Sequence, residues 1–161
     1  QAVAELYHET LDEREMFEYY DRRLRAAYSE QVVFKPFALE YLHYLRANGC
    51  KLALVTTTDR EYVDVLFERF GLHDYFEVIL TTKEVGASKS KPVIYHEAAR
   101  RLGLEVKDCV IFEDALFALE TARAAGYVTV GVEDHGHVDE KTLTRHCDLM
   151  IRSWEWIDRR G

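Results

Sequence analysis

Two adjacent acids close a short apolar run in the second half of the chain, and their types and spacing suit metal chemistry. Glu113 and Asp114 follow the apolar run 109–112, which is typical of a strand buried on both faces. Because neighbouring carboxylates repel each other, a hard divalent cation such as Mg²⁺ is the usual partner that keeps both ionised. The alternative interpretation is a helix N-terminus, where the same acids would favour the helix dipole.

Three consecutive threonines mark a second place where a strand should end. The apolar run 52–55 leads into Thr56, Thr57 and Thr58, and Asp59 follows them. Hydroxyls and backbone N–H groups at a strand–helix junction can hold a phosphate, assisted by the helix dipole. Either Thr58 or Asp59 is expected to cap the next helix. One cap does not need three threonines, so we interpret Thr56 as a ligand-binding residue.

A loop of small residues with two lysines follows the next apolar run, 78–80. This loop, 86–92, contains Lys89 and Lys91 and ends at Pro92, which should begin a helix. A lysine here offers a point charge for phosphate, although loop composition alone favours a solvated side chain for either one. In a parallel sheet the hydroxyls, an ammonium and the acids would converge at one edge. Together they describe a phosphate site with charge neutralisation.

The elements that must position these residues repeat one order: amphipathic helix, glycine, short apolar strand. We therefore predict an α/β fold with a doubly wound, Rossmann-like parallel sheet and helices on both faces. Glycine at a helix end supplies the left-handed turn that stops the helix. The expected helices are residues 37–47, 60–70, 92–102, 115–125 and 138–145, and the expected strands are residues 51–55, 76–80, 109–112, 127–132 and 148–151.

The N-terminal part of the chain has a different character. Residues 4–28 form a charged, tyrosine-rich helical stretch without strands or glycine punctuation. Pro36 marks the change, because it follows an extended linker and is suited to the start of a helix. We predict a separate helical module over residues 1–33 and the sheet domain over residues 34–161.

Composition limits the possible partners. The chain has 161 residues, 48% of them hydrophobic, which suits one ordinary domain with a small appendage. A net charge of −8 argues against a nucleic acid or an anionic membrane as partner. No apolar run approaches the ~20 residues of a membrane span. Three cysteines without metal-ligand spacing, Cys50, Cys109 and Cys147, are interpreted as reduced core residues of a cytoplasmic protein.

Taken in chain order, Thr56, Lys89 and the pair Glu113-Asp114 resemble the motifs of the haloacid dehalogenase-like (HAD) superfamily. The resemblance is closest to the branch of phosphatases and beta-phosphoglucomutase-like proteins that carry a helical cap. It covers nearly the whole chain, and three ordered motifs at matching strand ends make it specific. The segments similar to the lysine and acidic motifs of that branch are residues 86–103, 112–114 and 122–126.

The resemblance implies a role for each of these residues. Thr56 would bind the phosphoryl oxygens, Thr57 would offer its backbone N–H group, and Lys89 would neutralise phosphate and nucleophile. Asp114, with Glu113, would hold Mg²⁺. The implied activity is Mg²⁺-dependent hydrolysis of a small phosphorylated metabolite through an aspartyl-phosphate intermediate. A phosphohexomutase of the same family and a non-catalytic interaction module that kept the fold are the alternatives.

The chain also departs from the family pattern. Ala115, Ala118 and Val93 stand where Ser, Gly and Asp are common, and the Asp-x-Asp-Gly-Thr motif that supplies the nucleophilic Asp is not found. In the family that motif closes a mid-sheet strand, whose loss would leave unpaired edges at about 1–3 kcal/mol per buried group. We therefore expect further residues before Gln1, with residues 1–33 as the C-terminal part of the cap. A chain that starts at Gln1 is expected to be misfolded or inactive.

Overall fold

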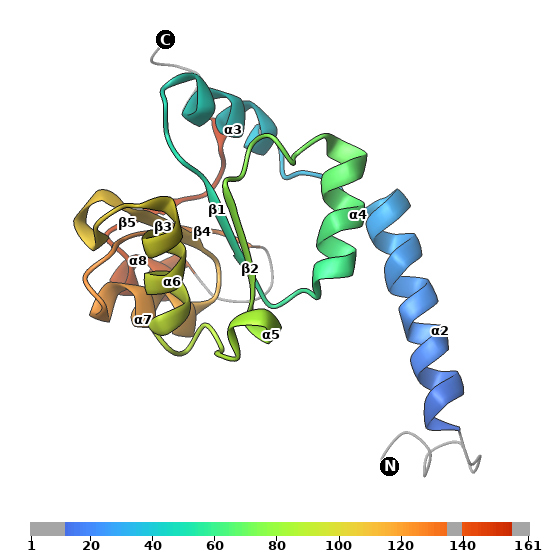
Figure 1. Cartoon of the computed structure of the whole chain (residues 1–161). Coiled ribbons are helices and arrows are strands. Elements are labelled where there is room, and N and C mark those ends of the chain that lie inside the picture. The colour runs from blue at the N-terminus through green and yellow to red at the C-terminus, as the bar shows by residue number, and fades with distance from the viewer. Residues whose placement is uncertain (1–11, 135–139, 156–161) are drawn as a thin grey trace.

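The computed structural model describes residues 12–134 and 140–155, and Figure 1 shows how their helices and strands are arranged. Helices and short strands alternate after the first helix, as predicted, and every strand pair is parallel. The elements are α2 (Glu13–Ala26), the π-helix η1 (Ala27–Gln31), α3 (Ala38–Ala47), β1 (Ala53–Thr56), α4 (Arg60–Phe70), β2 (Val78–Thr81), α5 (Thr82–Val85), α6 (Val93–Leu102), the 3₁₀-helix η2 (Val106–Asp108), β3 (Val110–Glu113), α7 (Leu116–Ala124), β4 (Val128–Val132), α8 (Glu140–His146) and β5 (Leu149–Ile151).

The strands form two parallel sheets rather than one continuous sheet. β1 pairs with β2 so that Thr56 lies opposite Thr81, and β4 lies between β3 and β5 with Glu113 opposite Gly131. Within the described residues, neither β1 nor β3 has a partner on its second side. The parallel α/β arrangement is confirmed, and the division falls where the family's mid-sheet strand was expected to be missing.

Helix α6 joins the two sheets on one face. Its residues Ile94 and Tyr95 are at most 2% exposed, and they form a core cluster against which Val55 of β1 and Ile111 of β3 both pack. An apolar cluster shared by two sheets stabilises their relative position, because separating them would return that surface to water. The strands that end in Thr56 and Glu113 therefore rest on the same helix.

An aromatic cluster joins the sheets on the other face. Tyr41 of α3 lies with its ring centroid 5.7 Å from that of Phe112 and 5.1 Å from that of Trp154, and the last two are 5.5 Å apart. Offset and edge-to-face aromatic pairs each contribute about 0.5–1.5 kcal/mol beyond area burial. Leu42 of α3 packs on the same core cluster as Leu54 of β1, so α3 connects β1 to β3 on this face without a strand between them.

The remaining helices complete the two layers. α4 buries Val63 and Phe67 against Leu54 and Ile79 on the outer face of the β1–β2 sheet. α7 and α8 cover β4 and β5 so closely that a Cβ atom at Gly131 would lie 2.9 Å from Cys147 Sγ. Helices therefore cover both faces, as predicted.

The N-terminal elements differ in detail from the prediction. α2 lies beside α4 and buries none of its residues, which agrees with its charged composition. The next sheet-domain helix starts at Ala38, one residue after the expected start at residue 37, and Pro36 lies before it. Phe37 adopts a left-handed conformation with φ of 64°, which interrupts the helical path after Pro36.

Two further expectations are corrected or only partly described. Cys50 is exposed, so the interpretation of all three cysteines as core residues was wrong, whereas Cys147 is buried. Residues 138 and 139, the expected start of the last helix, lie outside the described residues. None of the described helices combines the length and the apolar composition needed to span a membrane.

Candidate functional site

The three threonines lie at the end of β1, where the sequence predicted that the strand would stop. Thr56 is the last residue of the strand, and its Oγ1 atom accepts a hydrogen bond of 3.0 Å from the N–H group of Thr58. Because Oγ1 acts as the acceptor in that bond, the hydroxyl proton of Thr56 is free to be donated to a ligand oxygen. Thr57 is exposed beside it. This strand end can therefore present a hydroxyl donor to an anion.

The expected helix cap at this junction is not formed. Asp59 occupies the N-cap position of α4, but its carboxylate lies 3.2 Å from the ammonium of Lys83 and makes no capping bond. The hydroxyl of Thr58 lies 3.3 Å from that of Tyr28. The prediction that Thr58 or Asp59 caps α4 was therefore wrong, because both side chains bind partners on other elements.

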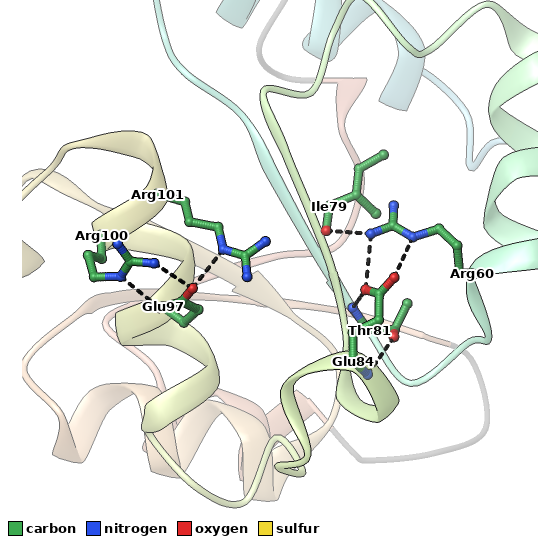
Figure 2. Close-up of polar contacts among 7 residues, drawn as sticks. All are labelled: Arg60, Ile79, Thr81, Glu84, Glu97, Arg100 and Arg101. Atoms are coloured by element: carbon green, nitrogen blue, oxygen red, sulfur yellow. Dashed lines mark hydrogen bonds and ion pairs between the residues drawn. The ribbon is translucent and has the colours of Figure 1, made fainter.

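Two parallel hydrogen bonds between Arg60 and Glu84 hold the threonine junction, residues 56–58, close to α5, the short helix after β2 (Figure 2). Arg60 donates from Nε to Oε1 of Glu84 at 2.8 Å and from Nη2 to Oε2 at 3.0 Å. Its Nη2 also donates to the carbonyl of Ile79 at 2.7 Å, while Glu84 accepts from the N–H of Thr81 at 3.0 Å. The Arg60 guanidinium lowers the pKa of Glu84 to about 2. The start of α4 and the start of α5 are thus held together.

The predicted lysine meets the first of the two predicted acids. Nζ of Lys89 lies 2.7 Å from Oε2 of Glu113, and the two side chains are only 16% and 7% exposed. Tyr95, whose pKa is raised by burial, donates its hydroxyl to the carbonyl of Lys89 at 3.2 Å. Lys91 is exposed. The structure therefore distinguishes the two lysines and brings Lys89 to the acidic strand end.

Both oxygens of Glu113 are engaged. While Oε2 contacts Lys89, Oε1 accepts from the N–H groups of Asp114 and Ala115, each at 3.2 Å. Burial disfavours the charged form, but the Lys89 ammonium and the hydrogen bonds outweigh it and hold the pKa of Glu113 below its usual range. Glu113 thus orients Lys89 and the turn after β3. These three contacts leave the second lone pair of Oε2 as its acceptor site for a metal ion.

Asp114 is the better placed of the two acids for a cation. It is half-buried directly after β3, where its carboxylate follows the turn that Glu113 holds. Magnesium prefers oxygen ligands and is usually bound through one or two carboxylates together with water and substrate phosphate. No group of three or more His, Cys, Asp or Glu side chains within the described residues could hold a metal. The acids therefore fit Mg²⁺ as part of a larger ligand set.

The structure places the remaining predicted residue, Thr56, through the packing of its strand. Val55 precedes it and packs on the α6 cluster that also receives Ile111, two residues before Glu113. Lys89 lies in the loop that enters α6, tied to Tyr95 of that helix. The hydroxyl and the acid therefore lie at the ends of strands that share one helix, with the ammonium in contact with the acid. The chemical roles of these residues stay predictions.

Three residues of this arrangement were missed in the sequence. Arg60 and Tyr28 contact partners 24 and 30 residues away, and nothing in the local sequence marks such contacts. Glu84 did leave a signal, because Thr81 and Glu84 have the spacing of a capping box, which the structure contains. That motif could have predicted the short helix α5.

Comparison with known sequences gives a consistent set of relatives. A family model described as haloacid dehalogenase-like hydrolase matches residues 2–126. The chain is 40% identical over 133 residues to protein CbbY of Rhodobacter capsulatus, covering 81% of this chain and 56% of the relative. It is 28% identical over 139 residues to a phosphorylated carbohydrates phosphatase of Thermotoga maritima, covering 84% and 64%. The chain therefore spans less than two thirds of the length of these relatives.

Solved structures share the fold over nearly the whole chain. A HAD phosphatase from Thermococcus onnurineus matches with a TM-score of 0.71 and 26% identity, covering 97% of this chain and 67% of that one. A Thermotoga maritima protein assigned as a beta-phosphoglucomutase matches with a TM-score of 0.78 and 26% identity, covering 94% and 71%.

Proposed function

The chain belongs to the haloacid dehalogenase-like hydrolases, in their phosphatase and phosphoglucomutase-like branch, and from this premise we propose that the protein is a Mg²⁺-dependent phosphohydrolase. Its substrate would be a small phosphorylated metabolite. The observation that supports this most strongly is the buried contact between Lys89 and Glu113, directly beside Asp114. The ammonium, together with a cation held by the acids, would neutralise negative charge on a phosphate and on the group that attacks it.

Each residue has a role that follows from its contacts. Thr56 would donate its free hydroxyl proton to a phosphoryl oxygen, and Thr57 would add its backbone N–H group. Lys89, held by Glu113, would neutralise negative charge on the phosphate as the ester bond breaks. Asp114, with Glu113 as a possible second ligand, would hold Mg²⁺, which when bound would polarise the phosphoryl oxygens.

The nucleophile would come from outside the residues described. We propose that a strand between β1 and β3 carries an aspartate whose carboxylate attacks phosphorus, so that the alcohol leaves with the ester oxygen. Water would then hydrolyse the aspartyl-phosphate and release inorganic phosphate. The second sides of β1 and β3, which lack partners in the described residues, support this position for the strand. Residues 1–33 would form the C-terminal part of a cap that covers the site.

Substitution of Asp114 tests the proposal. Asp114→Ala in the full-length protein should lower Mg²⁺-dependent hydrolysis of p-nitrophenyl phosphate at least about a hundredfold, because the metal loses its carboxylate ligand. Asp108→Ala, at an exposed aspartate of η2, is the matched control and should leave the rate unchanged. Equal rates for both variants and the wild type would contradict the assignment of Asp114.

A phosphohexomutase is the second candidate, favoured by the similarity to the Thermotoga maritima structure assigned to that activity. Both reactions would use the same threonine, lysine and acids, so the products must separate them. Incubation with a hexose 1-phosphate followed by ³¹P NMR distinguishes the two. Free phosphate indicates hydrolysis, whereas conversion to the hexose 6-phosphate indicates the mutase. If the wild-type protein converts neither p-nitrophenyl phosphate nor the hexose 1-phosphate, a non-catalytic module is favoured.

A further inference from the structure

A tyrosine outside the sheet domain reaches the threonine junction. The hydroxyl of Tyr28, on the π-helix η1, lies 3.3 Å from Oγ1 of Thr58, two residues after the proposed phosphate-binding Thr56. We infer that Tyr28 is a positioning residue that holds this junction in its binding conformation. The inference rests on the proposed function, since it assigns Tyr28 a part in phosphate binding at that same site.

Thr58 connects Tyr28 to the residue that would contact the phosphate. Its side chain binds Tyr28, and its backbone N–H donates to Thr56 Oγ1 at 3.0 Å. Because Thr56 accepts this bond, its own proton must point elsewhere, which is toward a ligand oxygen in the proposed complex. Loss of the hydroxyl of Tyr28 would free Thr58 to turn, and the donor direction of Thr56 would then no longer be fixed.

Contacts with two residues of α4 hold Tyr28 in place. Its ring stacks on Tyr62 of α4 with centroids 5.6 Å apart and an angle of 23° between the planes. Arg69, also on α4, donates to the carbonyls of Tyr28 at 3.3 Å, Val32 at 2.7 Å and Glu30 at 3.1 Å. These bonds satisfy carbonyls at the end of the π-helix that have no partner within it. The hydroxyl of Tyr28 therefore reaches Thr58 from a well-supported position.

Different hydrogen bonds position Thr58 and dock α2 on α4, so the two effects can be tested separately. A separate contact, the hydroxyl of Tyr62 donating to Asp21 at 2.7 Å, docks α2 on α4 and does not involve Thr58. Tyr62→Phe would therefore weaken docking while leaving the Tyr28–Thr58 bond in place. Tyr28→Phe keeps the ring stack and removes only that bond. The two variants should differ in phosphate binding if Tyr28 acts through Thr58.

The main experiment measures phosphate affinity in the full-length protein. Tyr28→Phe should raise both the KM for p-nitrophenyl phosphate and the inhibition constant of inorganic phosphate about two- to tenfold, the range of one neutral hydrogen bond. The kcat value should not change, because the phosphate contact of Thr56 that Tyr28 positions is shared by ground and transition states and therefore affects KM alone. Tyr19→Phe, which removes an exposed hydroxyl bound to Arg23, is the matched control and should match the wild type.

A second set of measurements keeps the inference separate from the proposed activity. Thr58→Val should reproduce the effect of Tyr28→Phe, and the double variant should show no further loss, because both changes remove the same bond. Hydrogen exchange at the Thr58 amide should be faster in Tyr28→Phe than in Tyr62→Phe. Equal exchange, or an unchanged inhibition constant, would overturn the inference. A wild-type protein without phosphatase turnover would instead refute the proposed function, while the exchange rates would still decide whether Tyr28 holds the junction.

Discussion

Two glutamates near the same helix accept equally short contacts from cations but join very different parts of the molecule. Glu97 lies 2.7 Å from both Arg100 and Arg101, all within α6, and these arginines are 70% and 49% exposed (Figure 2). Glu113 lies 2.7 Å from Lys89, and this pair is buried and connects β3 to the loop before α6. Distance alone does not rank such contacts. Burial and the elements that are joined determine their effect.

The ion pair of a third glutamate, Glu84, is less buried than the Lys89–Glu113 pair but, unlike the contacts of Glu97, joins two different elements. Glu84 and Arg60 are 41% and 36% exposed, and their two hydrogen bonds connect α5 to the start of α4 between residues that are 24 positions apart. The pKa of Glu84 and that of Glu97 are both lowered to about 2 by arginine hydrogen bonds. The two carboxyl groups therefore have similar pKa values, although Glu84 pairs with a residue of another helix and Glu97 pairs with residues of its own helix. We expect substitutions of Glu84 and Glu97 to differ in their effects on stability and activity.

The largest effect is expected where a buried charge loses its partner. Lys89→Met leaves Glu113 buried and unpaired, which should lower the free energy of unfolding by about 3–5 kcal/mol. Urea unfolding at pH 7 measures this change. Lys91→Met, at the exposed lysine of the same loop, is the control and should be as stable as the wild type. Comparable stability of the two variants would show that the buried Lys89–Glu113 pair contributes no more to stability than an exposed lysine does.

A compensating change sharpens the same comparison. Lys89→Met combined with Glu113→Leu removes both charges and should recover part of the lost stability, because no ion remains buried without a partner. The double variant should not recover phosphatase activity, since the ammonium is still absent. Full recovery of turnover would show that Lys89 serves the fold and not the reaction.

An intermediate effect is expected for Glu84→Gln. Loss of the charged capping-box residue should cost on the order of 1 kcal/mol at pH 7. The folded-state pKa of about 2 lies below the ordinary 4.5, so the folded protein binds fewer protons than the unfolded chain between these values. The stabilisation is thus present above about pH 4.5 and is lost as the pH falls toward 2.

Thermal melts across pH test this assignment of Glu84. The difference in melting temperature between the wild type and Glu84→Gln should be largest near pH 7 and should shrink from pH 4.5 downward. A difference that stays constant down to pH 3 would mean that the charge of Glu84 does not contribute. The variant should also raise KM for an aryl phosphate, because Arg60 at the start of α4 loses its partner.

The smallest effect is expected for Glu97→Gln. Its two arginine partners are exposed and lie on the same helix, so the contacts join no other element and the melting temperature at pH 7 should not change measurably. Activity should also equal that of the wild type. A loss as large as that of Glu84→Gln would show that sequence separation is not what distinguishes these pairs.

The local sequence determined the order of elements and the positions where strands end. Strand β1 does run into Thr56 and β3 does close at Glu113, because short apolar runs and polar residues define such boundaries locally. Gly71 and Gly103 end α4 and α6 in the left-handed conformation, as their positions predicted. Lys89 was also marked as a candidate, because its loop and its order between Thr56 and Glu113 resemble the family's lysine motif.

Only the tertiary structure decided how these pieces act together. It divided the strands into two sheets, brought Lys89 into contact with Glu113 and occupied both oxygens of Glu113. It also brought Tyr28 to Thr58 from another segment. Hydrophobic periodicity involves only residues that are close in the sequence, so the local sequence is enough to determine where helices and strands form. Burial and hydrogen bonding depend on which distant segments meet, and that is settled only when the whole chain packs.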